Sequence, residues 1–400
     1  MRPMLQSLLV IGALLAAPAA LRAQDSADTD VDRTAGHWAL NLTVGGTGLS
    51  IGNSARVNGL RINWSDRDLD IVNGINLTLW RPYKHLSGTI NGAAIGIVGP
   101  GASEINGLAF GLAGTVTERR MRGVSIAGLG VVSQGSIEGV SIAGLGAVAE
   151  GNVSGILVGG LGAVAQGRIT GVAVSGLGSV AQGDISGIAV AGLGAVAQGN
   201  VRGILVAGLG AVAQGRITGV AASLLGTVSQ GGLTGAGLSG LAVVTQGDLK
   251  WLSIAGLATV AQGDITGLTV SGLATVAQGR IHGISLNGLA LVAQEGISGV
   301  AIGGGGVVSQ RSISGVVASL YKVESPRISG FVFSSYLKAR SVTGLGVGLG
   351  YNQVRGTMVG LQVGIVNDAR VLRGFQLGLV NIARNNHGLA RVLPILNAHL

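Results

Sequence analysis

The pattern of hydrophobic and small residues along this chain repeats every sixteen positions. One clear copy, GVAVSGLGSVAQGDIS, runs from Gly171 to Ser186, and large aliphatic residues occupy five of its positions. The opening residue is Trp251 in one copy and otherwise recurs as Gly107, Gly123, Gly139, Gly155, Gly171, Gly187, Gly203, Gly219, Gly235, Gly267, Gly283, Gly299 and Gly315. A fixed short period without insertions indicates an array of stacked structural units.

The pattern inside the unit predicts strands and turns. Val172 and Val174 are two positions apart, which is the spacing of side chains on one side of a strand. Gly171, Gly176 and Gly183 are the expected corners, because glycine adopts positive φ without steric cost. A helix is disfavoured, since each glycine inside it would cost about 1 kcal/mol relative to alanine. We therefore predict an all-β repeat array, a β-solenoid with about 16 residues per coil.

Stacking of such coils would place equivalent residues above one another. We expect the large aliphatic residues Val172, Val174, Leu177, Val180 and Ile185 to re-enter one interior. The predicted interior ladder of turn leucines comprises Leu161, Leu177, Leu193 and Leu209.

A second ladder is expected at a corner, where side-chain amides can hydrogen-bond along the stack. Its members are Gln166, Gln182, Gln198 and Gln214. The small residues expected to point outward and form a flat, weakly polar face are Ala165, Ala181, Ala197, Ala213, Ala261 and Ala277.

A transmembrane antiparallel β-barrel with one strand per repeat is the alternative fold. The outward positions are unusually apolar for a soluble solenoid, which favours the barrel. However, residues 123–246 contain no Phe, Trp or Tyr for an aromatic girdle. In addition, Gly155–Thr170 matches Gly203–Thr218 at fifteen of sixteen positions, 48 residues apart. Duplication by three units does not preserve alternating strand direction, so the solenoid is preferred.

The N-terminus has the pattern of a secretory signal peptide. Arg2 supplies positive charge, the stretch Leu8–Ala17 is apolar, and small residues follow, with cleavage expected between Ala19 and Gln24. The expected organisation is a signal peptide at 1–23, a linker at 24–35, irregular β units at 36–106, the strict array at 107–314 and irregular β units at 315–400.

The irregular segments are expected to cap the array, as end repeats must. Between residues 36 and 106 the units share an aliphatic–Asn–Gly step, as in Val72–Gly74, followed by alternation typical of a turn and a strand. After Gly315 the spacing of the repeat is expected to change to 15, 14 and 12 residues.

Composition and charge narrow the chemistry. The chain of 400 residues contains 74 Gly and no Cys, so disulfides and thiolate chemistry are excluded. The net charge is +9, but the residue after the turn glycine changes sign, as in Arg168, Asp184 and Asn200. A nucleic-acid site needs a continuous basic stripe with stacking aromatics, so no nucleic-acid partner is predicted.

Few residues are candidates for a chemical site. Asp66, Asp68 and Asp70 alternate as carboxylates do in calcium loops, yet the loop glycine and the terminal Glu are missing, and a polar turn explains them as well. The five His have no partner at metal-ligand spacing, and Gly45–Gly48 lacks the Lys-Ser/Thr of a phosphate loop. We predict a non-enzymatic protein without a cofactor.

The C-terminal units resemble a known type of repeat. GLQVGIVN at Gly360–Asn367 and GFQLGLVNIA at Gly374–Ala383 are similar to the Gly-Leu-Gln-x-Gly-Leu-x-Asn repeats of bacterial exported surface-repeat proteins. The central array departs from this motif, with Ala in place of Gln and one more residue before Leu. The resemblance implies an envelope or surface location; it implies no activity and transfers no functional residues.

These features together predict an exported envelope or cell-surface repeat protein that acts as a scaffold or as an adhesion and interaction surface. The expected location is the outer membrane, the cell surface or the periplasm of a bacterium. The flat small-residue face is the candidate contact for an envelope or surface partner or for self-association, and close packing without a partner is equally compatible. An outer-membrane β-barrel with a structural or transport role is the alternative.

Overall fold

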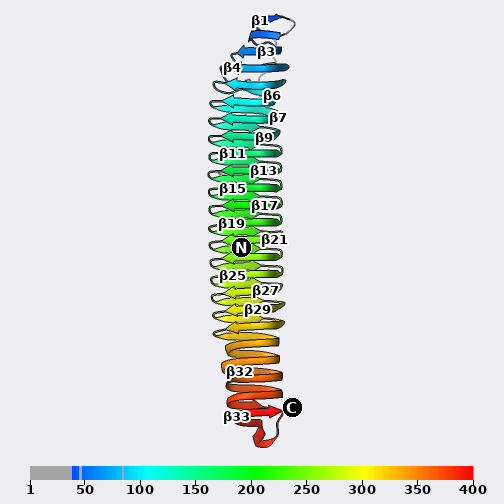
Figure 1. The fold of residues 1–400 in the computed structure, drawn as a ribbon, viewed down its shortest axis with the longest axis vertical. Coiled ribbons are helices and arrows are strands. Elements are labelled where there is room, and N and C mark those ends of the chain that lie inside the picture. The colour runs from blue at the N-terminus through cyan, green and yellow to red at the C-terminus, as the bar shows by residue number, and fades with distance from the viewer. Residues whose placement is uncertain (1–37, 45–46, 83–84, 400) are drawn as a thin grey trace, which may run out of the picture. The chain divides into compact units, whose positions relative to one another are not determined.

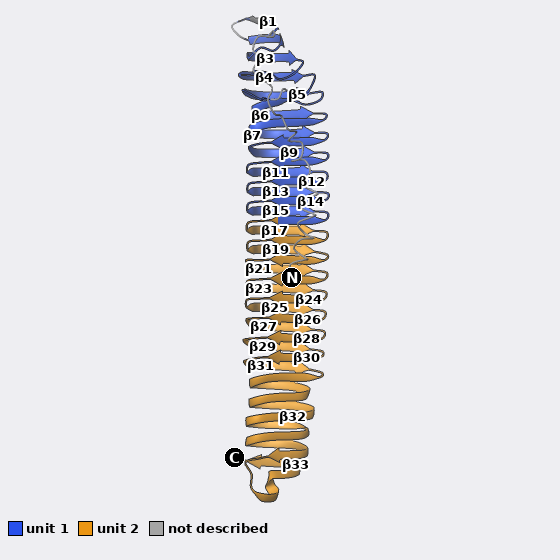
Figure 2. Ribbon diagram, turned by 180° about the vertical axis from the view of Figure 1, so that it is seen from behind, with its two compact units in different colours: residues 1–196 blue, residues 197–400 orange. Residues whose placement is uncertain are grey.

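A computed structural model describes residues 38–44, 47–82 and 85–399, which are mostly β-strand (Figure 1). Two compact units are present, residues 1–196 and residues 197–400 (Figure 2). The predicted signal peptide at 1–23 and linker at 24–35 lie outside the described residues. Among the described residues no helix is long and apolar enough to cross a membrane.

Unit 1 is a stack of parallel strands with one antiparallel strand, β1, at its start. Its strands are β1 (Ala39–Val44), β2 (Thr47–Gly52), β3 (Arg56–Asn63), β4 (Ile71–Thr78), β5 (Thr89–Gly96), β6 (Gly101–Gly111), β7 (Gly114–Ala127), β8 (Gly130–Ser133), β9 (Ser136–Ala143), β10 (Gly146–Ala149), β11 (Val153–Gly159), β12 (Gly162–Ala165), β13 (Ile169–Ser175), β14 (Gly178–Ala181), β15 (Ile185–Ala191) and β16 (Gly194–Ala197).

Unit 2 is also a stack of parallel strands, and an antiparallel strand, β33, ends it. Its strands are β17 (Val201–Ala207), β18 (Gly210–Ala213), β19 (Ile217–Ser223), β20 (Gly226–Ser229), β21 (Leu233–Ser239), β22 (Ala242–Thr245), β23 (Leu249–Ala255), β24 (Ala258–Ala261), β25 (Ile265–Ser271), β26 (Ala274–Ala277), β27 (Arg280–Asn287), β28 (Ala290–Ala293), β29 (Gly296–Gly303), β30 (Gly306–Ser309), β31 (Ser312–Ser319), β32 (Lys322–Ala383) and β33 (Val392–His399), with the 3-10 turn η2 (Gly388–Arg391) before β33.

Each coil of the array contains one long and one short strand, and each pairs in parallel with its equivalent in the next coil. In unit 1 the long strands β13 and β15 place Ile169 opposite Ile185, while the short strands β12 and β14 place Val164 opposite Val180. In unit 2, β23 and β25 pair in the same way. Parallel pairs offset by sixteen residues confirm the β-solenoid, and the transmembrane antiparallel β-barrel considered from the sequence is wrong.

The predicted corner at Gly171 lies within the long strand, where this residue has a φ of 124°. A Cβ atom placed on it would lie 2.1 Å from the carbonyl oxygen of Gly155 in the preceding coil. Both the left-handed φ and the close approach of the neighbouring backbone therefore require glycine here.

The prediction of which side faces the core is wrong for most of the unit. The turn leucines Leu161, Leu177, Leu193 and Leu209 are 48%, 38%, 46% and 44% exposed, and Val172, Val174 and Val180 are only partly buried. Ile185 alone among the five lies in the interior. The alanines expected outside are instead fully buried, namely Ala165, Ala181, Ala197, Ala213, Ala261 and Ala277.

The physical reason is the narrow space between the long and short strands of one coil. At Gly237 in β21, an added Cβ would lie 3.2 Å from Cγ1 of Val243 in β22, so these two positions face each other. Across this gap a large residue meets a small one. The buried pairs at equivalent positions include Leu157 with Ala163, Leu205 with Ala211, Gly237 with Val243 and Ser285 with Leu291, while Ala189 with Ala195 pairs two small residues.

Hydroxyl groups inside this narrow core bond to one another. In β13 and β14, Ser175 Oγ and Ser179 Oγ are 2.9 Å apart. In unit 2, Ser271 Oγ donates to Thr259 Oγ1 in the preceding coil at 2.9 Å. Serine and threonine are small enough for the gap, and these bonds offset the cost of burying their hydroxyls.

The C-terminal coils differ from the array because no turn interrupts their strand: β32 continues through several coils as one ribbon (Figure 1). Its positive-φ glycines are Gly330, Gly344, Gly360 and Gly374, so the steps from Gly315 are 15, 14, 16 and 14 residues. The predicted step of 12 residues, to Gly356, is wrong.

Candidate interaction surface

Outward-facing aliphatic side chains form four rows, which we call the aliphatic rows. Counted from the positive-φ position of each coil, they occupy the second, fourth, seventh and tenth residues. Between residues 203 and 308 all of these positions are aliphatic except Gly305. None of these side chains is fully buried, and the seventh-position row of unit 2 comprises Leu209, Leu225, Leu241, Leu257, Leu273 and Leu289, each exposed.

The same arrangement is present within unit 1. Its seventh-position row comprises Leu129, Leu145, Leu161, Leu177 and Leu193, all exposed. The backbone N–H of Leu177 donates to the carbonyl oxygen of Leu161 at 2.8 Å, and Leu193 bonds to Leu177 in the same way. Leu161, Leu177 and Leu193, three of the leucines named from the sequence, therefore do stack on one another, but on the surface.

The opposite turn of the coil forms a polar edge, made by the Gln-Gly-Asx or Gln-Gly-Arg residues. In unit 2, Asp248 Oδ1 accepts a hydrogen bond from the backbone N–H of Asp264 at 3.1 Å, and Asp264 Oδ1 accepts one from Arg280 at 2.7 Å. The bond from Asp264, supported by Lys250, holds the pKa of Asp248 below its usual value. The polar edge is thus built from charges that are compensated locally.

The glutamines of the predicted ladder lie on this polar edge with exposed side chains: Gln166, Gln182, Gln198 and Gln214. The backbone N–H of Gln182 donates to the carbonyl oxygen of Ala165 at 3.0 Å. Within the part of the chain that the structure describes, no side-chain hydrogen bond joins one array glutamine to the next.

Amide ladders are present instead in the irregular coils. In unit 1, Asn73 donates to Asn58 at 2.8 Å, Asn91 to Asn73 at 2.9 Å and Asn106 to Asn91 at 2.9 Å. The repeated aliphatic–Asn–Gly step is the sequence signal that could have located this ladder.

A buried amide ladder lies in the C-terminal coils. In unit 2, Asn352 donates to Asn367 and Asn367 to Asn381, both at 2.7 Å. The asparagines that end the Gly-Leu-Gln-x-Gly-Leu-x-Asn units are therefore interior residues that connect successive coils.

Asp66 is not arranged as a calcium ligand, because its carboxylate is already bonded on all sides. It is buried and accepts hydrogen bonds from Arg61 and Asn76 on Oδ1 and from Thr78 and the backbone N–H of Gly101 on Oδ2, at 2.8–3.0 Å. Burial lowers the pKa of Arg61, and Asp66 opposes this shift.

The other two candidate carboxylates lie elsewhere. Asp70 forms an exposed ion pair with Arg56, while Asp68 has a positive φ of 47°. Among the described residues no three His, Asp or Glu side chains are grouped so that they could hold a metal ion. The alternation of Asp66, Asp68 and Asp70 in the sequence thus does not bring three carboxylates together.

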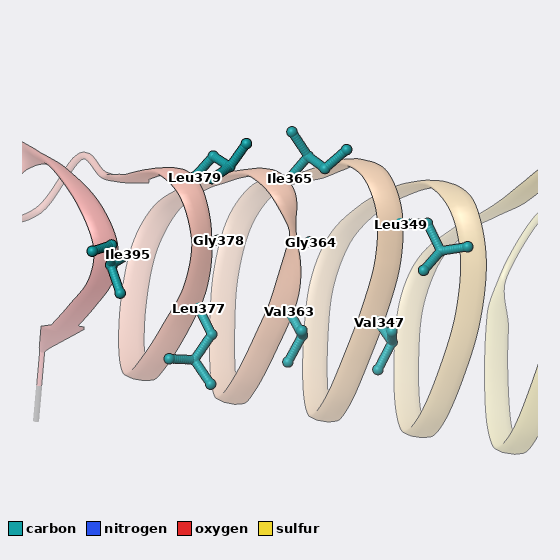
Figure 3. A pocket seen from close by; sticks show the side chains of 9 residues that line it. All are labelled: Val347, Leu349, Val363, Gly364, Ile365, Leu377, Gly378, Leu379 and Ile395. Carbon is teal, nitrogen blue, oxygen red and sulfur yellow. The ribbon is translucent and has the colours of Figure 1, made fainter.

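Two apolar grooves lie along the aliphatic rows of unit 2. The first has a volume of about 500 Å³ and is lined only by aliphatic residues and glycines (Figure 3). Val347, Val363 and Leu377 form one wall, and Leu349, Ile365 and Leu379 form the other. Gly364 and Gly378 lie between the walls, and Ile395 of β33 lies at one end.

The second groove, also of about 500 Å³, lies in the strict array. Here Ala222 interrupts the larger side chains of Val206, Leu238 and Ile254, and Leu224 lies beside the gap. The second groove was not foreseen, because the sequence pattern placed the fourth residue of the array coil, as at Val174, in the core.

No known protein family, no curated protein and no solved structure matches this chain. The resemblance to exported surface-repeat proteins therefore stays a prediction.

Proposed function

We propose that this protein is an exported, non-enzymatic scaffold of the bacterial envelope or cell surface, which binds its partner through the aliphatic rows. The observation that carries the proposal is the exposure of these rows. A soluble monomer rarely exposes large contiguous apolar patches, and such patches mark interaction surfaces. The small-residue face considered from the sequence is not available for this role, because its alanines are buried.

The regular coil supports a scaffold rather than a catalyst. Inward positions of the array are filled by small packing residues and bonded hydroxyls. On the polar edge, Arg280 pairs with Glu295 at 3.3 Å, and Asp248 and Asp264 accept backbone hydrogen bonds. Export is supported by the signal-peptide pattern at 1–23, outside the described residues.

The test is expression of the full chain in a Gram-negative bacterium, followed by separation of cytoplasm, periplasm and envelope. One variant replaces Leu241, Leu257 and Leu273 with Ser, and its matched control replaces Gln246, Gln262 and Gln278 with Ser. Full burial of a leucine contributes about 1.5–3 kcal/mol, and 1.4 kcal/mol is about tenfold in affinity. Replacement of these three half-exposed leucines should therefore weaken envelope retention by roughly tenfold or more.

The control variant should behave like the natural chain, and circular dichroism of both variants checks that the solenoid is formed. Recovery of the natural chain in the cytoplasm would contradict export. Equal envelope retention of the leucine and glutamine variants would show that the aliphatic rows are not the interaction surface.

A further inference from the structure

The two grooves of unit 2 occupy the same place in the coil. Val206, Ala222 and Leu238 are the fourth residues of their coils, and so are Val347, Val363 and Leu377 of the first groove. The same side of the coil is therefore hollowed twice, once in the strict array at Ala222 and once in β32.

Close packing of the backbone leaves no room for a side chain at the glycines between the walls of the first groove. A Cβ atom on Gly364 would lie 2.2 Å from the carbonyl oxygen of Gly348, and one on Gly378 would lie 1.9 Å from that of Gly364. Larger residues are sterically excluded at Gly364 and Gly378, so the hollow between the aliphatic walls of the first groove follows from the backbone packing of β32.

The lining chemistry selects a hydrocarbon occupant. The first groove contains no polar side chain (Figure 3). In the second, the hydroxyls are used inside the core, since Ser239 donates to Thr227 Oγ1 at 2.9 Å and Ser223 lies 3.1 Å from the same atom. A peptide or sugar ligand would leave its own polar groups without partners in such a groove, which costs free energy.

The distribution of the aliphatic rows argues against a second copy of the chain as the occupant. The rows lie on the long strand, on the turn and on the short strand of each coil. A flat interface with one partner would cover one of these sides and leave the others in water. A lipid layer can surround all of them at once, as it does the apolar side of an interfacial amphipathic element.

The polar edge determines which side of the solenoid would face water. Its charges are compensated by Asp248–Lys250 and Arg280–Glu295 pairs, each at 3.3 Å, and its glutamines are exposed. We infer that the aliphatic rows of unit 2 bind the acyl region of a lipid layer, with hydrocarbon chains packed in the two grooves and the polar edge in water. This inference rests on the proposed function and names the partner.

The chain contains no cysteine, which allows a direct test by single-cysteine labelling. Leu241→Cys places a label on the aliphatic rows and Gln246→Cys places one on the polar edge of the same coil. Each purified full chain carries an environment-sensitive fluorophore, and iodide quenching is measured with and without phosphatidylcholine vesicles. The neutral headgroup leaves apolar contact as the main attraction.

Vesicles should reduce quenching severalfold at position 241 and leave it unchanged at position 246. Quenching at 241 that is unaffected by vesicles would overturn the inference. Shielding at 241 that depends on protein concentration without vesicles would also overturn it, because a second copy would then cover the rows. That last result would leave the proposed function intact, and the envelope-retention experiment decides the proposed function independently.

A substitution inside the second groove supplies an independent test. Ala222→Asp places a charge between the aliphatic walls, and Gln230→Asp places the same charge on the polar edge of the same coil. In vesicle flotation, Ala222→Asp should bind at least severalfold more weakly than the natural chain, and Gln230→Asp should bind equally well. Equal flotation of both variants would contradict packing of hydrocarbon in the groove.

Discussion

Trp251 occupies a backbone position that the neighbouring coils give to glycine. Its φ is 95°, whereas Gly235 and Gly267 have φ values of 129° and 117°. Its side chain is 74% exposed, so burial does little to offset the strain. A bulky residue with such a φ is a genuine outlier, and strain of this kind costs about 1–3 kcal/mol.

Trp251→Gly should therefore stabilise the coil that contains β23. We expect a gain of about 1–3 kcal/mol, since that is the strain removed. The measurement is the denaturant dependence of amide hydrogen exchange in β23 and its partners. Trp251→Ala is the control, because it removes the ring and keeps the strained φ; if it stabilises as much as Trp251→Gly, the strain argument is incorrect.

A charged cluster on β32 gives a pH dependence. Lys322 lies 2.5 Å and Lys338 2.6 Å from Glu324, and their hydrogen bonds, that of Lys322 foremost, hold the pKa of Glu324 below its ordinary value of 4.5. A lowered folded-state pKa means that the stabilisation is present above the unfolded pKa and is lost as pH falls through the folded pKa.

The comparison of the natural chain with Glu324→Gln isolates this contribution. The natural chain should have the higher unfolding midpoint at neutral pH, and the difference should shrink as pH falls below about 4.5. The residues are partly exposed, so high salt should also reduce the difference. A difference that is the same at pH 7 and at low pH would contradict the ion-pair explanation.

At the scale of the element, the space between the two strands of one coil is narrow, and small residues fill much of it, chiefly from the short strands. Ala261 in the short strand β24 is fully buried, whereas its neighbour Val260 faces outward. The side chain that would normally be regarded as core is outside, and the alanine is inside.

Ala261→Leu should destabilise unit 2, and Val260→Leu should not. Overpacking of a filled core costs typically 1–3 kcal/mol, while surface changes stay within about 0.5 kcal/mol. The unfolding midpoints of the two variants measure the difference. If Val260→Leu is the more damaging change, the assignment of the two sides is reversed.

The sequence predicted the order of stacking but not the sides of the strands. Period and glycine spacing determine which residues lie above one another, and Gly171 shows the expected positive φ. However, the adjacent residues Val172 and Ala173 point to opposite sides of the strand and both are apolar, so the sequence pattern does not show which of them is inside. The deciding quantity is the distance between β13 and β14, which depends on the turns that connect them.

The same limit applies to the candidate sites. Side-chain amides do form ladders in this fold, but the ladders join asparagines such as Asn73 and Asn367 and do not include Gln182. A short asparagine beside a bend has few rotamers to lose, whereas an exposed glutamine loses more side-chain entropy on ordering. The grooves depend on residues from successive coils, such as Val363 and Leu377, which only the stacking brings together.

At the scale of the whole molecule, the repeat makes each unit modular. In a stack each coil contacts only its neighbours, so its stability is a sum of coil and interface contributions. In unit 2 the coil that begins at Gly267 pairs through β25 with β23 before it and with β27 after it, in one register.

Deletion of residues 267–282, one complete coil, should therefore preserve the fold. The new neighbours Ile265 and Ile297 would replace the aliphatic pairs that each now forms with Ile281, at the same register. Deletion of residues 267–281 is the control, because it leaves His282 as an extra residue in the joined strand and reverses the sides of Ile265 and Thr266 relative to Gly283 and Ile284. Circular dichroism and thermal unfolding should show a folded protein for the first deletion and a severely destabilised one for the second.

The antiparallel strands at the two termini have a consequence for aggregation. Parallel strands in register, each above its equivalent, share their hydrogen-bond geometry with amyloid, which grows by adding chains to an open edge. In unit 1, β1 runs antiparallel to β2, and in unit 2, β33 runs antiparallel to β32. An antiparallel edge has a different hydrogen-bond pattern from a parallel one. Among the described residues, the edge strands β1 and β33 thus do not present the parallel pattern that would template another coil.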